Sequence, residues 1–219
     1  MKLNRCHYPS LMLVIVAALL ASCTAKQPDN IDNICDIFSE QRSWYKAANK
    51  SAKRWGTTVP VIMSVIHQES SFKAKAKPPR TKILWVFPGP RPASAKGYAQ
   101  AIDGTWDTYR RSTGRWSADR ADFKDATDFI GLYIEQSARK NGIKKTDAEN
   151  LYLSYHEGQG GFAKGTHQGK PWLMKVAKKV HARAKPLISS SQAASENLKN
   201  GSSGCFKRKT KKLRSVTKP

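Results

Sequence analysis

The stretch TTVPVIMSVIHQESSF, residues 57–72, decides the fold of this chain. Ile62, Val65 and Ile66 recur at the spacing of one helix face, and the next position on that face is Glu69. The two threonines that open the stretch can cap such a helix, and the proline close behind them suits its first turn. The pattern predicts an amphipathic helix that carries Glu69 at its C-terminal end.

A carboxyl group in this position has two interpretations. An isolated glutamate is most often a solvated residue at a fraying helix end. A carboxyl group aimed into an apolar wall is instead disfavoured as an anion, so its pKa rises. A carboxylic acid that stays protonated near neutral pH is what a general acid requires. Glu69 is therefore a candidate catalytic residue, and other motifs must decide between the two interpretations.

The N-terminal segment has the pattern of a bacterial export signal. Lys2 and Arg5 give it a positive start, and residues 11–20 form an apolar run. That run is too short for a bilayer span, which takes roughly 20 residues. It ends in LASC at residues 20–23, which resembles a bacterial lipobox and implies cleavage before Cys23 and acylation of that cysteine. The alternative is ordinary signal cleavage beside an incidental cysteine. We expect a lipid-anchored periplasmic protein, and the threonine after the cysteine favours the outer membrane.

The chain holds four cysteines. Cys6 would leave with the signal and Cys23 would carry lipid, so Cys35 and Cys205 remain in the mature chain. Disulfides persist in exported proteins, which predicts a Cys35–Cys205 bridge. Two free thiols are the alternative. No spacing of cysteine and histidine resembles a zinc site, so we expect neither a metal ion nor another cofactor.

The organisation of the chain follows from composition and periodicity. It divides into a signal peptide (1–22), a polar tether (23–35), one domain (36–185) and a linker with a basic tail (186–219). Apolar periodicity predicts helices over 36–55, 57–72, 123–140, a segment capped by Thr146, and 171 to 186, with a shorter helical face formed by Tyr98, Ile102, Trp106 and Tyr109. Residues 73–96 are rich in proline and predict a long irregular loop. No alternating strand pattern occurs, so the predicted class is mostly α.

Three short motifs occur in order along the predicted domain. They are HQESSF at residues 67–72, AKGYAQ at 95–100 and LSYHEG at 153–158. Together they resemble the lytic transglycosylases with an SLT domain, whose motifs are a Glu-Ser pair, Gly-Leu-Met-Gln and Ala-Tyr-Asn-x-Gly. The resemblance covers residues 36–185 and implies a lysozyme-like (SLT, goose-type lysozyme-like) helical fold. The proline-rich segment is then a long loop insertion.

The match departs from the family pattern in three places. Tyr98 and Ala99 replace Leu-Met, which keeps an apolar lining of different shape. His156 stands where the family has asparagine, which puts the role of that side chain in doubt. The gap from Glu69 to Gly97 is longer than in the family, and the proline-rich segment accounts for the excess.

The resemblance implies a reaction with a single carboxyl group. Glu69 would protonate the bond between N-acetylmuramic acid and N-acetylglucosamine, and would then act as a base on the 6-hydroxyl of the muramoyl sugar. The product would be a 1,6-anhydromuramic end. A hydrolase would need a second carboxylate. Asp103 and Asp107 follow the second motif, but their positions favour the surface of a helix.

Four further residues are expected at the substrate site. Ser70 would bind near the acetamido group, or else bond the backbone at a helix end. Gln100 would direct its amide at the sugar or at Glu69, and solvation is its alternative. Tyr155 would place its hydroxyl in the cleft, although its helix face also fits the core. Tyr98 would line the site, and the aromatic residues of the proline-rich segment fit either sugar stacking or a loop anchor.

The formal net charge of +23 favours anionic polymers. In the periplasm these are peptidoglycan and lipid headgroups. A basic tail at residues 207–214 would indicate nucleic-acid binding in a cytosolic protein, and the export signal argues against that here. A hydrolytic muramidase and a non-catalytic peptidoglycan-binding lipoprotein remain alternatives. An enzyme that opens the wall for a secretion or conjugation machine is a third, narrower one.

Overall fold

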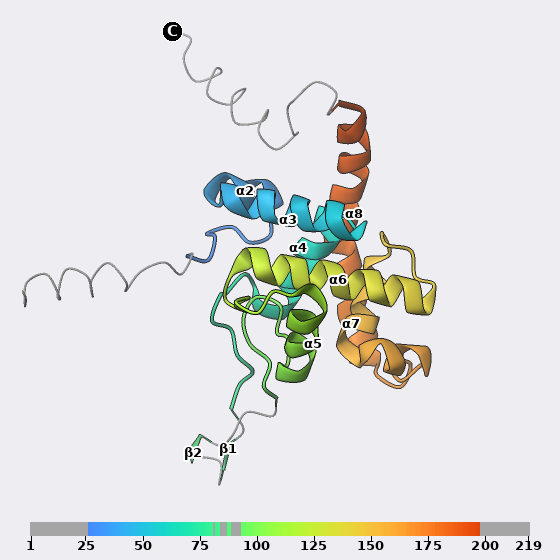
Figure 1. The fold of residues 1–219 in the computed structure, drawn as a ribbon. Helices are drawn as coiled ribbons and strands as arrows, with labels where there is room; N and C mark the ends of the chain where they lie inside the picture. Colours follow the sequence, from blue (N-terminus) through green and yellow to red (C-terminus); the bar gives the residue numbers. More distant parts are fainter. Residues whose placement is uncertain (1–25, 81, 84–86, 89–92, 198–219) are drawn as a thin grey trace, which may run out of the picture.

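The computed structural model describes residues 26–80, 82–83, 87–88 and 93–197. These residues are mostly helical (Figure 1), as predicted from the sequence. Element labels follow Figure 1. The helices are α2 (Ile34–Glu40), α3 (Arg42–Trp55), α4 (Val59–Ser70), α5 (Asp103–Thr113), α6 (Phe123–Asn141), α7 (Ala148–Ala163) and α8 (Pro171–Asn197). None of the helices in this part of the chain combines the length and the hydrophobicity that crossing a bilayer requires.

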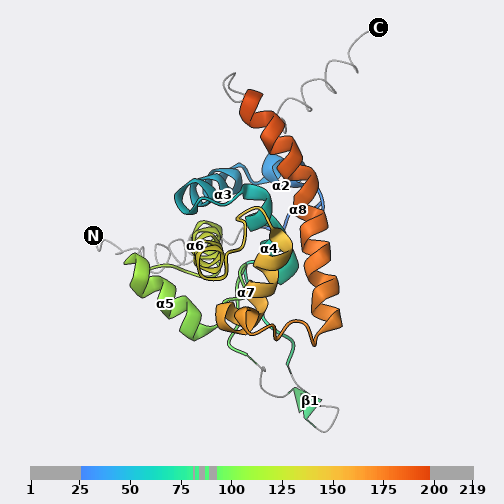
Figure 2. The ribbon, with the colours of Figure 1, turned by 90° about the vertical axis from the view of Figure 1, so that its right-hand side faces the viewer.

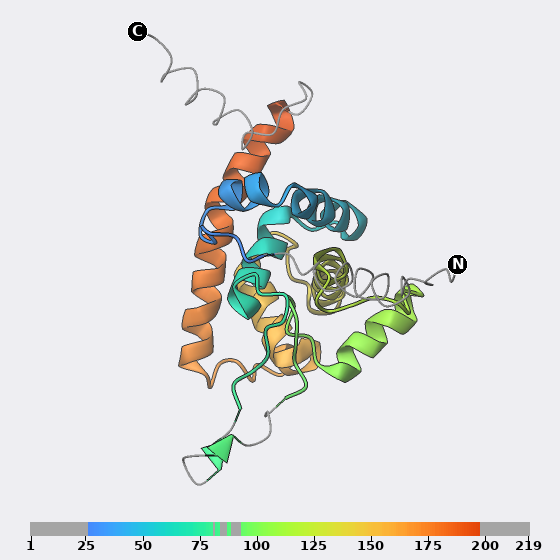
Figure 3. The same cartoon turned by 90° about the vertical axis from the view of Figure 1, so that its left-hand side faces the viewer.

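Helix α4 is the centre of the domain. It packs against α8, α3, α6 and α7, and Figures 2 and 3 show it between the long α8 and α6, which is seen end-on. Val61, Ile62, Val65 and Ile66 are all at most 1% exposed. Burying a side chain of this size contributes roughly 1.5–3 kcal/mol. The helix is thus surrounded by protein, and the apolar face predicted from the sequence is part of a wider apolar surface.

A buried carboxylate joins α3, α5 and α6. Asp128 accepts hydrogen bonds from Arg54 (3.1 Å), Arg115 (3.0 Å), the Tyr109 hydroxyl (2.9 Å) and the Trp55 indole (3.0 Å). Removing one partner of such a buried pair destabilises a protein strongly, because the other charge is left uncompensated. The donors account for the burial of this charge, so Asp128 is a structural carboxylate.

Three predicted helix boundaries were wrong, two of them at α3 and α7. The predicted helix over 36–55 is divided at Gln41, whose φ of −121° and ψ of 70° interrupt the helical backbone between α2 and α3. The N-cap of α7 is Asp147 and not Thr146, because the Asp147 carboxylate accepts a bond from the backbone N–H of Asn150. Thr58 occupies the N-cap position of α4, but its side chain makes no capping hydrogen bond, so the predicted threonine cap is only positional. The proline in the first turn is confirmed.

The predicted helical face from Tyr98 to Tyr109 was wrong in its first half. Tyr98 lies in a turn, and Ile102 is the N-cap of α5 with a side chain that is 48% exposed. The end predicted for the last helix was also wrong, since α8 continues past Pro186 to Asn197. A proline removes one backbone hydrogen bond from a helix, and here the helix continues despite that loss.

The proline-rich segment leaves the helical body. It contains the strands β1 (Lys82–Ile83) and β2 (Phe87–Pro88), which pair antiparallel with Ile83 opposite Phe87. Figure 1 shows these strands well away from the helices. The sequence did not predict strands this short, but the predicted insertion is present between α4 and α5.

Part of the predicted tether lies against the domain. The Gln27 side chain donates to the carbonyl oxygen of Ser71 at 2.7 Å, and Asp32 contacts the His67 ring at 3.0 Å. Cys35, at the start of α2, is disulfide-bonded, and its partner lies outside the described residues. The Cys35–Cys205 pairing therefore stays a prediction. Cys23, Cys205 and the basic tail all lie outside the described residues.

Candidate active site

Glu69 occupies the last turn of α4, which ends in an unusual backbone turn. Ser71 and Phe72 both have positive φ, 50° and 62°. Non-glycine residues in this region are strained by about 1–3 kcal/mol each, and such strain concentrates at functional sites. The Phe72 side chain is 1% exposed and stacks on Trp44 at 5.9 Å. Burial of this ring compensates for the strain and fixes the direction of the last turn.

The surroundings of Glu69 raise its pKa to about 7. The cause is loss of solvent around the carboxyl group, although the residue keeps some exposure. A hydrogen bond from the Tyr152 hydroxyl acts in the opposite direction, because it stabilises the anion. No neighbouring carboxylate contributes to the shift. Near pH 7 Glu69 is thus available both with and without its proton.

Tyr155 joins the three sequence motifs. Its hydroxyl donates to the carbonyl oxygen of Ala99 at 2.5 Å, which links the third motif to the second. Its pKa is raised well above the usual value, first by burial and then by the charge of Glu69, which places it beside the first motif. Its ring also lies 5.0 Å from that of Tyr133 on α6. The structure therefore brings the motifs together around Glu69.

The second motif forms a tight turn beside the site. Gly97 has a φ of 79°, and a Cβ there would overlap the backbone carbonyl of Arg120. The Gln100 side-chain amide donates to the carbonyl oxygens of Ala76 (3.0 Å) and Gly97 (2.8 Å). Gln100 therefore braces the loop after α4, and its amide N–H groups are not directed at Glu69.

Two predicted substrate contacts are structural in this geometry. Tyr98 is 1% exposed, packs edge-on against Trp44 and Phe123, and has a pKa that burial raises to about 12. A substrate does not reach a side chain so deep in the core, so the expected lining role is corrected. Ser70 is buried, and its hydroxyl donates to the Ile66 carbonyl at 3.1 Å. This is the backbone bond that the sequence left open as its alternative.

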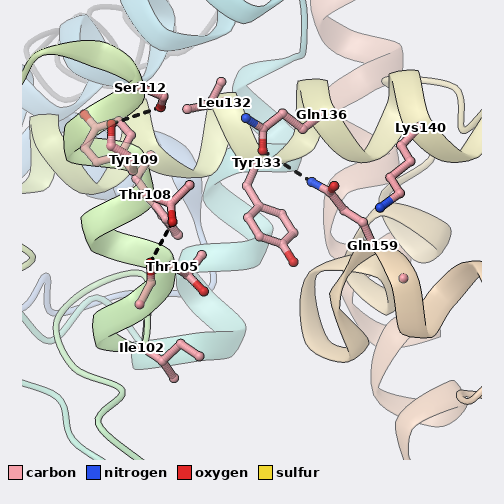
Figure 4. Close-up of a pocket in the computed structure, with 13 residues that line it drawn as sticks. Ile102, Thr105, Thr108, Tyr109, Ser112, Leu132, Tyr133, Gln136, Lys140 and Gln159 are labelled. Atoms are coloured by element: carbon pink, nitrogen blue, oxygen red, sulfur yellow. Dashed lines mark hydrogen bonds between the residues drawn. The ribbon is translucent and has the colours of Figure 1, made fainter.

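A groove of about 490 Å³ lies between α5 and α7 with α6 along its wall. Figure 4 shows Thr105 and Thr108 on one side, Gln159 on the other, and the Tyr133 side chain pointing between them. Gln159 also donates to Gln136 at 3.3 Å. The hydroxyl and amide groups suit a polar polymer, and the contact between Tyr133 and Tyr155 connects the groove with Glu69.

The carboxylates considered as partners of Glu69 are placed elsewhere. Asp103 is 61% exposed and paired with Arg120, whose hydrogen bond lowers the pKa of Asp103. Asp107 pairs with Arg110 at 3.5 Å on the exposed side of α5. Both are surface residues, as the sequence favoured. Among the described residues, no group of three or more histidine, cysteine or carboxylate side chains is arranged to hold a metal ion.

Sequence reasoning missed the parts played by Tyr152 and Tyr133. Neither residue is among those expected at the substrate site from the sequence. The signal for Tyr152 was present, because it precedes Tyr155 by three residues and lies on the same helix side. Tyr133 carries no such signal, since its proximity to Tyr155 depends on the packing of α6 against α7.

Comparison with known proteins agrees with this geometry. The family model described as "Transglycosylase SLT domain" matches residues 11–190, a range that includes all three motifs. The predicted family and its lysozyme-like helical fold are confirmed. No curated protein matches the chain significantly.

Proposed function

Because the chain belongs to the transglycosylase SLT domain family, we propose that it is a peptidoglycan lytic transglycosylase with Glu69 as its single acid and base. The substrate is the β-1,4 bond between N-acetylmuramic acid and N-acetylglucosamine, and the products carry 1,6-anhydromuramic ends. The observation that carries the proposal is the desolvated Glu69 carboxyl, with its pKa of about 7, among tyrosines and without a carboxylate partner.

In the first step Glu69 donates its proton to the glycosidic oxygen. The bond between that oxygen and C1 breaks, and the electron pair leaves with the oxygen as the 4-hydroxyl of the departing sugar. Positive charge develops at C1 and is compensated by the acetamido oxygen of the same muramoyl sugar. No protein carboxylate is needed for this compensation.

In the second step the Glu69 carboxylate removes the proton of the muramoyl 6-hydroxyl. That oxygen attacks C1, which closes the 1,6-anhydro ring and restores the protonated acid. No water is consumed. One residue must be an acid and then a base, and a pKa close to the working pH suits both steps. The Tyr152 hydrogen bond and the desolvation act in opposite directions on this pKa.

The groove of Figure 4 is the proposed path of the glycan strand on the α5 side of Glu69. Its threonine and glutamine side chains can bond sugar hydroxyls and acetamido groups. The exposed Lys140 lies at its far end and can pair with a carboxylate of a lactyl group or stem peptide. The net charge of +23 adds a general attraction to the anionic wall.

We further propose that the enzyme acts in the periplasm as a lipoprotein anchored through Cys23, with the outer membrane as its site. The apolar run at 11–20 and the LASC sequence at 20–23 support this location. The enzyme would then be held at the lipid surface by its anchor, with peptidoglycan strands as its substrate. A cell-wall or secretion machine is a further candidate partner.

Product analysis of purified sacculi tests the proposed function. The protein is expected to release muropeptides that are lighter by one water than the corresponding reducing sugars, measured by mass spectrometry. Reducing ends would identify a hydrolytic muramidase instead. Absence of any product, with retained binding to sacculi, would identify a non-catalytic glycan-binding protein.

The Glu69→Gln variant tests the assigned residue. It keeps the shape of the side chain but can neither donate nor take the proton, so turnover is expected to fall at least about 10²–10⁴-fold. Its folding is checked by denaturation at pH 8, where the wild-type carboxyl is charged and its desolvation penalty is fully present. The variant should be at least as stable there. Asp103→Asn is the matched control and should cleave at the wild-type rate.

A further inference from the structure

An exposed tryptophan lies on α8, which packs against both α4 and α7. Trp172, in the first turn of α8, is 56% exposed. A single exposed apolar residue needs no explanation by itself. Trp172, however, contacts the exposed His156 ring edge-on, with ring centres 5.3 Å apart. It therefore belongs to a cluster, and the position of that cluster relative to Glu69 becomes informative.

The cluster leads directly to the catalytic carboxyl. The His156 ring lies 6.4 Å from that of Tyr152, and the Tyr152 hydroxyl bonds Glu69. Trp172, His156 and Tyr152 thus form a row of rings, here called the aromatic row. It begins at Glu69 and ends at an exposed indole.

On α7, the residues that lead to the aromatic row and to the groove point in different directions. Successive helix residues are about 100° apart around the axis, so Tyr155 and His156 leave α7 in different directions. Tyr155 leads to Tyr133 and the groove between α5 and α7. His156 leads to α8. A strand held in the groove would therefore meet the aromatic row after passing Glu69.

Hydrogen bonds hold the aromatic row in place. Glu157 accepts bonds from Lys170 at 2.8 and 2.9 Å, from the Thr166 hydroxyl, and contacts His156 Nδ1 at 3.1 Å. The Lys170 and Thr166 bonds lower the pKa of Glu157 to about 2, so this anchor stays charged at neutral pH. Lys170 directly precedes α8, and Leu173, the residue after Trp172, is completely buried. The indole is therefore presented by a fixed backbone.

We propose that Trp172 and His156 form a sugar-binding subsite on the α8 side of Glu69, in which the indole stacks on a hexosamine ring of the same glycan strand. The proposal rests on the function proposed above. An indole face offers a large apolar surface to the C–H face of a sugar. His156 Nδ1 faces Glu157, which leaves the other nitrogen to bond a hydroxyl or acetamido group. The His156 ring packs against Trp172, and the asparagine that the family has at this position offers no such ring. This packing gives His156 a role in the proposed subsite.

Binding of chito-oligosaccharides of increasing length tests the subsite. Calorimetric titration would use the full chain carrying Glu69→Gln, so that no oligosaccharide is cleaved. Affinity is expected to rise as the chain becomes long enough to reach Trp172. Adding Trp172→Ala should abolish this rise and weaken binding of the longest chain about tenfold. Trp172→Phe should restore part of it.

Trp116→Ala is the matched control, because Trp116 is 60% exposed and lies beyond the end of α5, outside the motifs around Glu69. Equal affinities of the Trp172→Ala and Trp116→Ala proteins for every chain would overturn the subsite and leave the proposed function intact. In a parallel titration with peptide-bearing glycan strands, a loss confined to these strands would overturn the subsite in favour of stem-peptide contact. If the parent protein binds no glycan and the wild type cleaves none, the proposed function fails as well.

Discussion

At the scale of single residues, the site depends on the balance between desolvation and one hydrogen bond at Glu69. Desolvation raises the pKa of Glu69 to about 7, and the Tyr152 hydroxyl restrains that rise. In the proposed mechanism, the free enzyme needs the protonated form of Glu69 to start the reaction. Its kcat/KM is therefore expected to fall as the pH rises through about 7.

Tyr152→Phe removes the hydrogen bond that stabilises the Glu69 anion and keeps the ring. The pKa of Glu69 should rise, and the falling limb of the kcat/KM profile should move to higher pH by about 0.5–1 unit. The measurement is the pH dependence of release of soluble muropeptides.

Tyr133→Phe is the control for this change, because Tyr133 lies in the same cluster but contributes nothing to the pKa of Glu69. Its profile should keep the wild-type position. If Tyr152→Phe lowers the rate at every pH without moving the limb, Tyr152 has only a packing role.

At the scale of elements, the turn before α5 has little tolerance for substitution. Gly97 combines a φ of 79° with direct contact to the backbone of Arg120. Gly97→Ala should therefore lower the free energy of unfolding by roughly 2–4 kcal/mol, measured by chemical denaturation. Activity should fall with it, because Ala99 in the same turn accepts the Tyr155 hydrogen bond.

Gly104→Ala is the control at this scale. Gly104 lies in the first turn of α5, and no other group lies within 4 Å of a Cβ placed there. Alanine is a better helix former, so the change should be neutral or stabilising by up to about 1 kcal/mol. Equal losses in the two variants would show that the Gly97 turn is not constrained.

The sequence predicted the elements better than their ends and contacts. The apolar face of α4 was predicted correctly because its residue spacing is local, and the position of Glu69 followed from it. Gln100 and Tyr98 were misjudged because their environments depend on the Gly97 turn and on rings from α3 and α6. A motif indicates which residues belong together, but packing decides which of them face the substrate.

At the scale of the whole molecule, a disulfide is expected to join the two ends of the mature chain. Cys35 is disulfide-bonded, and Cys205 is the partner that the sequence predicts. Closing so long a loop contributes up to about 4–5 kcal/mol in the entropic model. Peptide mapping of unreduced, periplasm-derived protein should find Cys35 joined to Cys205. Two reactive thiols under denaturing conditions would contradict the pairing.

The hydrogen bond between Gln27 and Ser71 limits the distance between Glu69 and the proposed lipid anchor. Only residues 24–26 lie between Gln27 and the proposed lipid-bearing Cys23. An extended chain spans about 3.5 Å per residue, so the segment from Cys23 to Gln27 measures at most about 14 Å. Ser71 is close to Glu69 along the chain. The anchored enzyme would therefore cleave only the glycan strands nearest its membrane, and it would not contact strands deeper in the wall.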